Sequence, residues 1–325
     1  MKKYALLGVC LLCVTVALLF FLRLSPEESA STNTATTAPS LAENLTDLEK
    51  DRVHTMVARM SLEEKVGQLF MVSFSGTTLS DDEAAWLAGE KVGGVILLGK
   101  NVSTREQSRA LITDIHERAS SGLAASLLVA TDQEGGLVSR FTFFGPKERY
   151  AESAVATPDA AFALGKLRGT LLRELGVDIN FSPVVDVATT PEDFMYERAV
   201  RGDAKTVAGL GAALIRGYRE GGILATAKHF PGHGGTLVDS HRNLPTIHRD
   251  KETQEEHLAP FADAITAGVP LVMTAHVLIP ELDATYPASI SPTITTGILR
   301  DRLGFSRVIV TDDLVCAWPT EQEAD

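Results

Sequence analysis

Short apolar runs alternate with longer amphipathic segments along most of this chain, and this alternation limits the folds that it can adopt. Seven apolar runs, rich in Val, Ile and Leu, occur at 68–74, 94–98, 126–131, 177–187, 223–229, 269–276 and 307–311. Helical periodicity marks the segments between them, chiefly 104–120, 158–175, 204–220, 250–267 and 293–303. Nearly continuous apolar strands that alternate with helices predict a parallel sheet covered by helices.

Two α/β folds share this alternation, the TIM-type (β/α)8 barrel and the doubly wound open sheet. No Gly-x-Gly-x-x-Gly motif follows an early apolar run, so a dinucleotide-binding open sheet is disfavoured. Polar residues instead follow most of the runs, and they include Asp132, Asp186, Lys228, His276 and Asp312. A barrel builds its active site at the carboxyl ends of its strands. We therefore predict an α/β fold of the (β/α)8 type with a site at that end.

The first 46 residues differ from the rest of the chain. Residues 4–22 carry no charge, and a helix of that length reaches about 30 Å, the thickness of the bilayer hydrocarbon. We expect residues 1–24 to be a membrane anchor, with a cleaved signal segment as the alternative, and the remainder to be extracytoplasmic. Residues 25–46 are mainly Ser, Thr, Ala and Pro, which predicts a flexible linker. The barrel then occupies residues 47–325.

The seventh apolar run ends close to the last residue of the sequence. After Asp312 the chain continues only to Asp325, which is too short for a crossover helix, an eighth strand and a closing helix. Pro319 also interrupts the helix that should begin there. We therefore expect a barrel that is truncated after its seventh strand, with its stability and activity at risk.

Composition excludes one class of partner. The chain has 42 acidic and 30 basic residues, which gives a formal net charge of −12. Nucleic-acid binding needs concentrated Lys and Arg, so we expect no nucleic-acid partner.

Six short motifs carry the chemistry of the sequence. In chain order they are Asp132-Gln-Glu-Gly-Gly136 with Arg140, Glu197-Arg198, Lys228-His-Phe-Pro-Gly-His-Gly234, Asp239-Ser-His241, Met273-Thr-Ala-His276 and Thr311-Asp-Asp-Leu314. These motifs resemble the signature segments of glycoside hydrolase family 3, in its β-N-acetylglucosaminidase branch. The Lys-His-Phe-Pro-Gly-His-Gly segment, followed by Asp-Ser-His, is the most specific part of the resemblance.

The resemblance implies a retaining exo-β-N-acetylglucosaminidase that removes terminal N-acetylglucosamine from peptidoglycan or chitin-type fragments through a covalent glycosyl-enzyme. It places the nucleophile at Asp312, while strand alternation would point Asp313 away from the site. It places the proton donor at His241, with Asp239 as its partner, on a mobile loop for which Gly232, Gly234 and Gly235 would be hinges. A histidine titrates near neutral pH, so it can protonate the leaving oxygen and later deprotonate water.

The resemblance also implies the residues that bind the terminal sugar. Asp132, Arg198, Lys228 and His229 would contact its hydroxyls and N-acetyl group. Arg140 would either order the Asp132 segment or contact the sugar directly. We expect a carbohydrate substrate, no cofactor and a monomeric protein.

Two alternatives to this activity stay open. His229, His233, Asp239 and His241 could form a metal centre of a metal-dependent hydrolase. However, Pro231 and Gly232 would break the helix needed to place His229 and His233 on one face, so we expect no metal site. The second alternative is a catalytically impaired, truncated barrel that only binds glycan.

Overall fold

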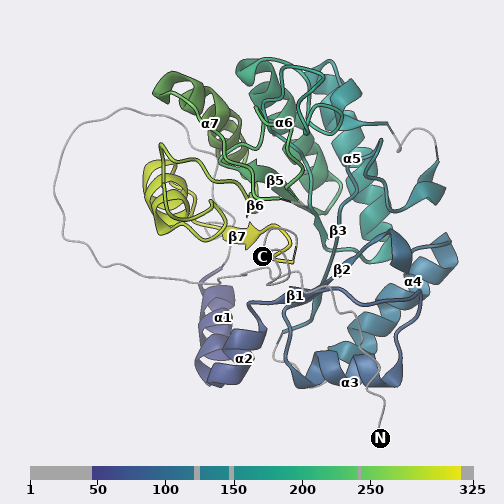
Figure 1. Ribbon diagram of the computed structural model, residues 1–325. Helices are drawn as coiled ribbons and strands as arrows, with labels where there is room; N and C mark the ends of the chain where they lie inside the picture. The colour runs from purple at the N-terminus through teal and green to yellow at the C-terminus, as the bar shows by residue number, and fades with distance from the viewer. Residues whose placement is uncertain (1–45, 121–124, 146–149, 241–242, 316–325) are drawn as a thin grey trace, which may run out of the picture.

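The computed structural model describes residues 46–120, 125–145, 150–240 and 243–315. Within these ranges the seven expected strands form one parallel sheet, and their order in space is their order in the chain (Figure 1). The strands are β1 (Met71–Val72), β2 (Gly94–Leu97), β3 (Leu128–Thr131), β4 (Ile179–Asn180), β5 (Leu224–Phe230), β6 (Leu271–Thr274) and β7 (Val308–Thr311).

Helices connect successive strands and cover the outer face of the curled sheet (Figure 1). The α-helices are α1 (Asp47–Arg59), α2 (Leu62–Gly67), α3 (Asp81–Gly89), α4 (Arg105–Asp114), α5 (Pro158–Leu175), α6 (Ala204–Glu220) and α7 (Lys251–Thr266). The 3₁₀ and π helices are η1 (Gly99–Asn101), η2 (Ile115–Ala119), η3 (Thr142–Phe144), η4 (Glu152–Ala154) and η5 (Thr293–Arg302). The structure therefore confirms the strand and helix alternation that the sequence predicts.

The two faces of the sheet follow the two-residue period of a strand. Val95, Leu97 and Val129 belong to the large core between the sheet and the helices. The alternate residues pack across the sheet in a second core inside its curve, which contains Met71, Ile96, Ala130, Ile179, Phe181, Leu271, Met273 and Val310. Asp132 and Asp312 follow Ala130 and Val310 by two residues, so the same period directs their carboxylates toward the interior.

Within the described residues, the recorded pairings run from β1 to β7, and none joins β7 back to β1. The sheet is thus an open, curled barrel of seven strands, which confirms the predicted α/β barrel class at that level. Truncation of an eighth unit stays a prediction.

The fourth apolar run forms a shorter strand than predicted. The sequence predicts a strand over 177–187, but β4 ends at Asn180, and the rest of the run contains Pro183, which has no N–H for a regular ladder. The chain nevertheless continues beside β5, since Val185 N–H donates to the carbonyl of Lys228 at 2.8 Å. This irregular segment brings Asp186 next to His229.

Among the described residues, no helix is both long enough and apolar enough to cross a bilayer. The expected anchor at 1–24 and nearly all of the expected linker at 25–46 lie outside those residues.

Candidate active site

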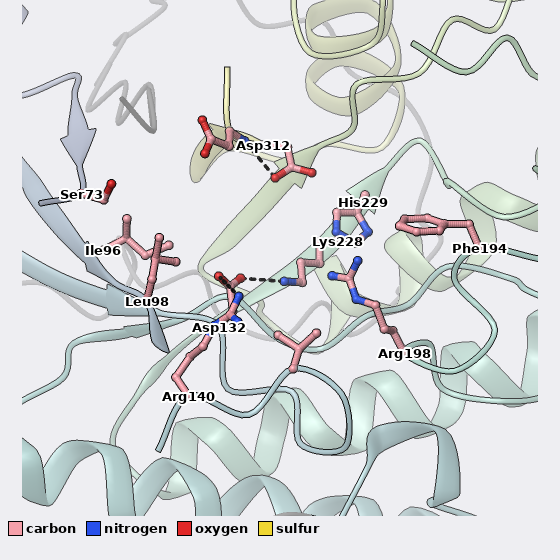
Figure 2. A pocket seen from close by; sticks show the side chains of 12 residues that line it. Ser73, Ile96, Leu98, Asp132, Arg140, Phe194, Arg198, Lys228, His229 and Asp312 are labelled. Atoms are coloured by element: carbon pink, nitrogen blue, oxygen red, sulfur yellow. Dashed lines mark hydrogen bonds and ion pairs between the residues drawn. The ribbon is translucent and has the colours of Figure 1, made fainter. Parts of the chain in front are cut away.

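A pocket of about 360 Å³ opens at the carboxyl ends of the strands (Figure 2). Its lining contains six of the eight site residues that the sequence predicts: Asp132, Arg140, Arg198, Lys228, His229 and Asp312. Ser73, Ile96, Leu98, Val138, Phe194 and Asp313 complete the lining. Figure 2 shows Asp312 facing Asp132 and Lys228 across the pocket, with Ser73, Ile96 and Leu98 on one side and Arg198 and Phe194 on the other.

Asp312 is the first residue after β7. Its backbone N–H donates to the carbonyl of Thr274 on β6 at 3.0 Å, and its Oδ1 accepts a hydrogen bond from Asp313 N–H at 2.9 Å. Burial alone would raise the pKa of Asp312, but His229, His276 and the Asp313 N–H outweigh it and lower this pKa to about 2. Asp312 is therefore an ionised carboxylate at neutral pH.

The side chain of Asp313 does not point in the predicted direction. Strand alternation would point it away from the site, yet it lines the pocket beside Asp312. The chain leaves the strand conformation after Thr311, and Val315 N–H donates to Asp313 Oδ1 at 2.9 Å in a local turn. The two-residue period therefore no longer applies at this position.

Lys228 lies in the floor of the pocket with only 2% of its surface exposed. Its Nζ lies 2.9 Å from Asp132 Oδ1 and 2.6 Å from Glu134 Oε1. Burial would lower the pKa of Lys228, but these two carboxylates raise it above the ordinary value. The ammonium group stays charged, and two of its three N–H donors are directed at protein carboxylates.

Glu134 also holds Arg198 in place, a role that the sequence prediction did not assign. Its carboxylate accepts from Arg198 Nη2 at 2.8 Å and from Arg198 Nε at 3.0 Å, while the Glu134 residue is 1% exposed. Burial opposes ionisation, but Arg198 and Lys228 hold the pKa of Glu134 well below its usual range. A planar bidentate pair of this kind fixes the guanidinium in one orientation.

A buried polar network supports Glu134 from below. Arg168 is fully buried, and its Nη1 donates to the Glu134 carbonyl at 2.9 Å, to Glu152 Oε1 at 3.1 Å and to Tyr218 Oη at 3.1 Å. The Ser182 hydroxyl also contacts Glu152 and Tyr218. Helices α5 and α6 are thereby connected to the segment that carries Asp132 and Glu134.

Arg140 lies between the pocket and the segment that carries Asp132. Its side chain lines the pocket, and its Nη2 lies 3.6 Å from Asp132 Oδ2. Its backbone N–H donates to Gln133 Oε1 at 2.6 Å, which ties the loop after β3 together.

His229 is oriented by Asp186. The His229 Nδ1 lies 2.7 Å from Asp186 Oδ2, and because a carboxylate only accepts, Nδ1 carries the hydrogen. Burial would raise the pKa of Asp186, but the neighbouring His229 and His233 lower it to about 2. The same carboxylate accepts from the backbone N–H of His233 at 2.6 Å. Asp186 therefore fixes both the ring of His229 and the start of the following loop.

The loop after β5 leads to the predicted proton-donor pair, and its first glycines are closely packed. A Cβ on Gly234 would lie 1.9 Å from the Val187 carbonyl oxygen, so close packing excludes any side chain there. Arg249 Nη2 donates to the carbonyls of Gly232, at 3.1 Å, and Gly234. These contacts anchor the start of the loop against its neighbours, and the hinge role of the glycines stays a prediction.

The proton-donor pair itself is only partly described. Asp239 is half-buried in this loop and is not part of the pocket lining. His241 lies outside the described residues.

A comparison with protein-family models now connects this site with known proteins. Residues 61–321 match the model of the glycosyl hydrolase family 3 N terminal domain. The chain belongs to glycosyl hydrolase family 3. Within the family, it is 38% identical over 255 residues to a beta-hexosaminidase from Xylella fastidiosa strain M23, across 76% of this chain and 74% of that protein.

Solved family 3 structures give the same result. A β-N-acetylglucosaminidase from Paenibacillus sp. str. FPU-7 is 37% identical with a TM-score of 0.74, across 79% of this chain and 50% of that one, so this chain spans half of its length. NagZ from Neisseria gonorrhoeae, solved with N-trifluoroacetyl-D-glucosamine, is 33% identical with a TM-score of 0.68, across 75% and 74% of the two chains. The family 3 resemblance, its β-N-acetylglucosaminidase branch and the glycoside hydrolase class are thereby confirmed.

The metal-centre alternative depends partly on His241, which the structure does not describe. Among the residues that it does describe, no group of three His, Cys, Asp or Glu side chains is arranged to hold a metal ion. His229 and His233 lie on a strand and the following loop rather than on a helix. His229 Nδ1 is already engaged by Asp186.

Proposed function

We propose that this family 3 protein is a retaining exo-β-N-acetylglucosaminidase that removes terminal N-acetylglucosamine from peptidoglycan or chitin-type fragments. The observation that carries the proposal is the placement of the ionised Asp312 carboxylate opposite the charged group of Asp132, Lys228 and Arg198 in one pocket. A pocket of about 360 Å³ is at the small end of the range for ligand sites and suits a single terminal sugar.

In the first step, a carboxylate oxygen of Asp312 attacks the anomeric carbon and forms a glycosyl ester. The bond from that carbon to the leaving oxygen breaks, and His241, paired with Asp239, donates a proton to this oxygen. In the second step, water attacks the same carbon while His241 accepts its proton. The ester bond breaks, and Asp312 is released as a carboxylate. Two displacements leave the product with the configuration of the substrate.

The charged side of the pocket supports recognition of a sugar rich in hydroxyl groups. Asp132 can accept hydrogen bonds from hydroxyls, whereas Lys228 and Arg198 can donate to hydroxyl and carbonyl oxygens. The ion pairs with Glu134 hold both cations in place before a ligand arrives, which lowers the entropic cost of binding.

The names of the relatives support an N-acylated amino sugar. The Xylella relative is named beta-hexosaminidase, and the Neisseria structure holds an N-acylglucosamine. On this basis the terminal sugar carries an N-acetyl group.

We also propose an extracytoplasmic monomer held to the membrane through residues 1–24. The support is the uncharged segment at 4–22. Fractionation of cells that express the full chain should place the protein in the membrane fraction, and sedimentation in detergent should give one chain per particle. A secreted, soluble form with a shortened N-terminus would indicate a cleaved signal segment instead.

The activity is tested by hydrolysis of 4-nitrophenyl N-acetyl-β-D-glucosaminide, with the anomer formed first read by NMR. We expect the β anomer, no loss of rate with a chelator, and no turnover by Asp312→Ala. Asp263→Ala, on the exposed side of α7, is the matched control and should retain full activity. A first-formed α anomer would exclude retention, and loss of activity with a chelator would indicate the metal-dependent alternative. Sugar binding without turnover would indicate a barrel that only binds glycan.

A further inference from the structure

We propose that His276 is a positioning residue for the nucleophile and that it acts through the peptide group between Asp312 and Asp313 and the carbonyl of Asp313. The inference rests on the proposed function, because it takes Asp312 as the nucleophile. It concerns a histidine to which neither the sequence motifs nor the proposed mechanism assigns a role.

His276 follows β6 by two residues, and Asp312 follows β7 directly. The two strands pair in parallel, with Thr274 opposite Thr311, so both residues lie at the same edge of the sheet. The His276 Nε2 lies 2.9 Å from the carbonyl oxygen of Asp313. A carbonyl oxygen only accepts, so Nε2 carries the hydrogen and donates it.

Ser289 fixes the other ring nitrogen. His276 Nδ1 lies 2.7 Å from Ser289 Oγ, and in the neutral ring Nδ1 accepts from this hydroxyl. His276 is 4% exposed and Ser289 is 7% exposed. Two hydrogen bonds on opposite sides of a buried ring set both its tautomer and its orientation.

Asp313 passes this constraint to the nucleophile. Its carbonyl is held by His276, while its backbone N–H donates to Asp312 Oδ1 at 2.9 Å. Within the described part of the chain, the hydrogen bond to the Asp312 carboxylate is accepted by Oδ1. This leaves Oδ2 as the oxygen that attacks. Loss of the His276 bond removes one of the contacts that hold Asp313, whose Oδ1 also accepts from Val315 N–H, and so weakens the hold of the Asp313 N–H on the Asp312 carboxylate.

His276 is not among the residues that line the pocket, and both of its ring nitrogens are engaged by protein groups, Ser289 and the carbonyl of Asp313. This separates its role from that of a catalytic residue: its loss should change the rate of attack by Asp312 and leave substrate binding nearly unchanged. A misplacement of about 1 Å at a reacting group costs about 100-fold in rate.

The test measures how fast a 5-fluoro N-acetylglucosaminyl fluoride forms a covalent adduct, because such a reagent is attacked by the nucleophile and released slowly. We expect His276→Leu to lower the maximal rate of adduct formation by about 10- to 100-fold, with the concentration for half-maximal rate changed less than about threefold. His276→Gln keeps an N–H donor near the Nε2 position and should recover most of the rate. Ser289→Ala should give a smaller loss and serves if the leucine variant does not fold.

His116→Leu is the matched control. Its Nε2 also hydrogen-bonds a backbone carbonyl, that of Gly176 at 3.2 Å, but Gly176 precedes β4 at the opposite end of the sheet. This variant should form adduct at the wild-type rate.

Three results would overturn the inference, and they can be told apart. An adduct on Asp312 that forms at the wild-type rate in the folded His276 and Ser289 variants would exclude the positioning role and leave the proposed function unaffected. A higher reagent concentration for half-maximal rate, with an unchanged maximal rate of adduct formation, would also exclude the positioning role. An adduct on another residue would overturn the assignment of Asp312 in the proposed function, and the role of His276 with it.

Discussion

Glu134 accepts two hydrogen bonds from Arg198, at 2.8 and 3.0 Å, and this ion pair lies almost entirely beneath the surface of the pocket. Lys228 adds a third contact to the same carboxylate at 2.6 Å. One buried acid thus orients both Lys228 and Arg198. It would do so without touching the sugar.

Replacement of Glu134 by Ala should therefore weaken both stability and substrate binding. Removing one partner of a buried ion pair costs about 3–5 kcal/mol, because the remaining charges lose their counter-charge. Urea unfolding should show this loss, and the KM for the chromogenic substrate should rise. Glu197→Ala is the control, since the exposed pair of Glu197 with Arg201 should contribute less than about 1 kcal/mol. Equal effects of the two substitutions would contradict the role given to Glu134.

Asp186→Asn should misorient His229. An amide can present its NH₂ group to Nδ1 and thereby favour the other tautomer of the ring. We expect kcat/KM to fall by about 10- to 100-fold, by misplacement of a group that contacts the substrate. Asp186→Glu keeps the charge but moves the carboxylate. We expect it to lower kcat/KM clearly while lowering the free energy of unfolding less. Full activity of the asparagine variant would show that the ring needs no fixed tautomer.

His233 should make the protein sensitive to mild acid. Burial lowers the pKa of His233 to about 4, although Asp186 opposes this, whereas the unfolded chain has an ordinary histidine pKa of about 6.5. Between these values the unfolded state binds the additional proton, so the free energy of unfolding falls as pH decreases from about 6.5 to about 4. The slope from one such residue is about 1.4 kcal/mol per pH unit.

Urea unfolding of wild type and His233→Asn at pH 7, 6 and 5 measures that slope. In the asparagine variant this slope should be smaller by the contribution of about one proton, even if the variant is less stable at pH 7. His248→Asn, at an exposed histidine, should keep the wild-type slope. Identical slopes for wild type and His233→Asn would exclude a buried neutral histidine at this position.

His241→Ala should affect substrates according to their leaving group. A general acid contributes about 10²- to 10⁴-fold to catalysis, and a leaving group that departs easily as an anion needs it least. We expect a small loss with a dinitrophenyl glycoside and a large loss with an alkyl glycoside, measured as kcat/KM over a series of leaving-group pKa values. Equal losses across the series would exclude His241 as the acid.

The positions of Asp132 and Asp312 could be predicted from the sequence because both lie two residues beyond an inward-facing residue of a strand. The same rule failed at Asp313, where the chain turns out of the strand conformation. Helix α3 was not predicted, yet Ser80 and Glu83 form a capping box that the sequence already contains.

Glu134 and the Arg168 network could not be assigned in the same way. Glu134 and Arg198 are 64 positions apart in the chain, and their pairing depends on how the loops after β3 and β4 approach each other. Arg168 looks like an ordinary polar residue of an amphipathic helix until the packing of α5 against α6 buries it completely. Contacts of this kind follow from tertiary structure, which local periodicity does not determine.

The most direct test of the account identifies the residue that carries the sugar in the trapped glycosyl-enzyme. Peptide mass mapping after reaction with the 5-fluoro reagent, with fragmentation that separates Asp312 from Asp313, gives the answer. We expect one sugar per chain, on Asp312, and no adduct in Asp312→Ala. An adduct on Asp313 or elsewhere, or turnover of N-acetylglucosaminides by Asp312→Ala at the wild-type rate, would contradict it.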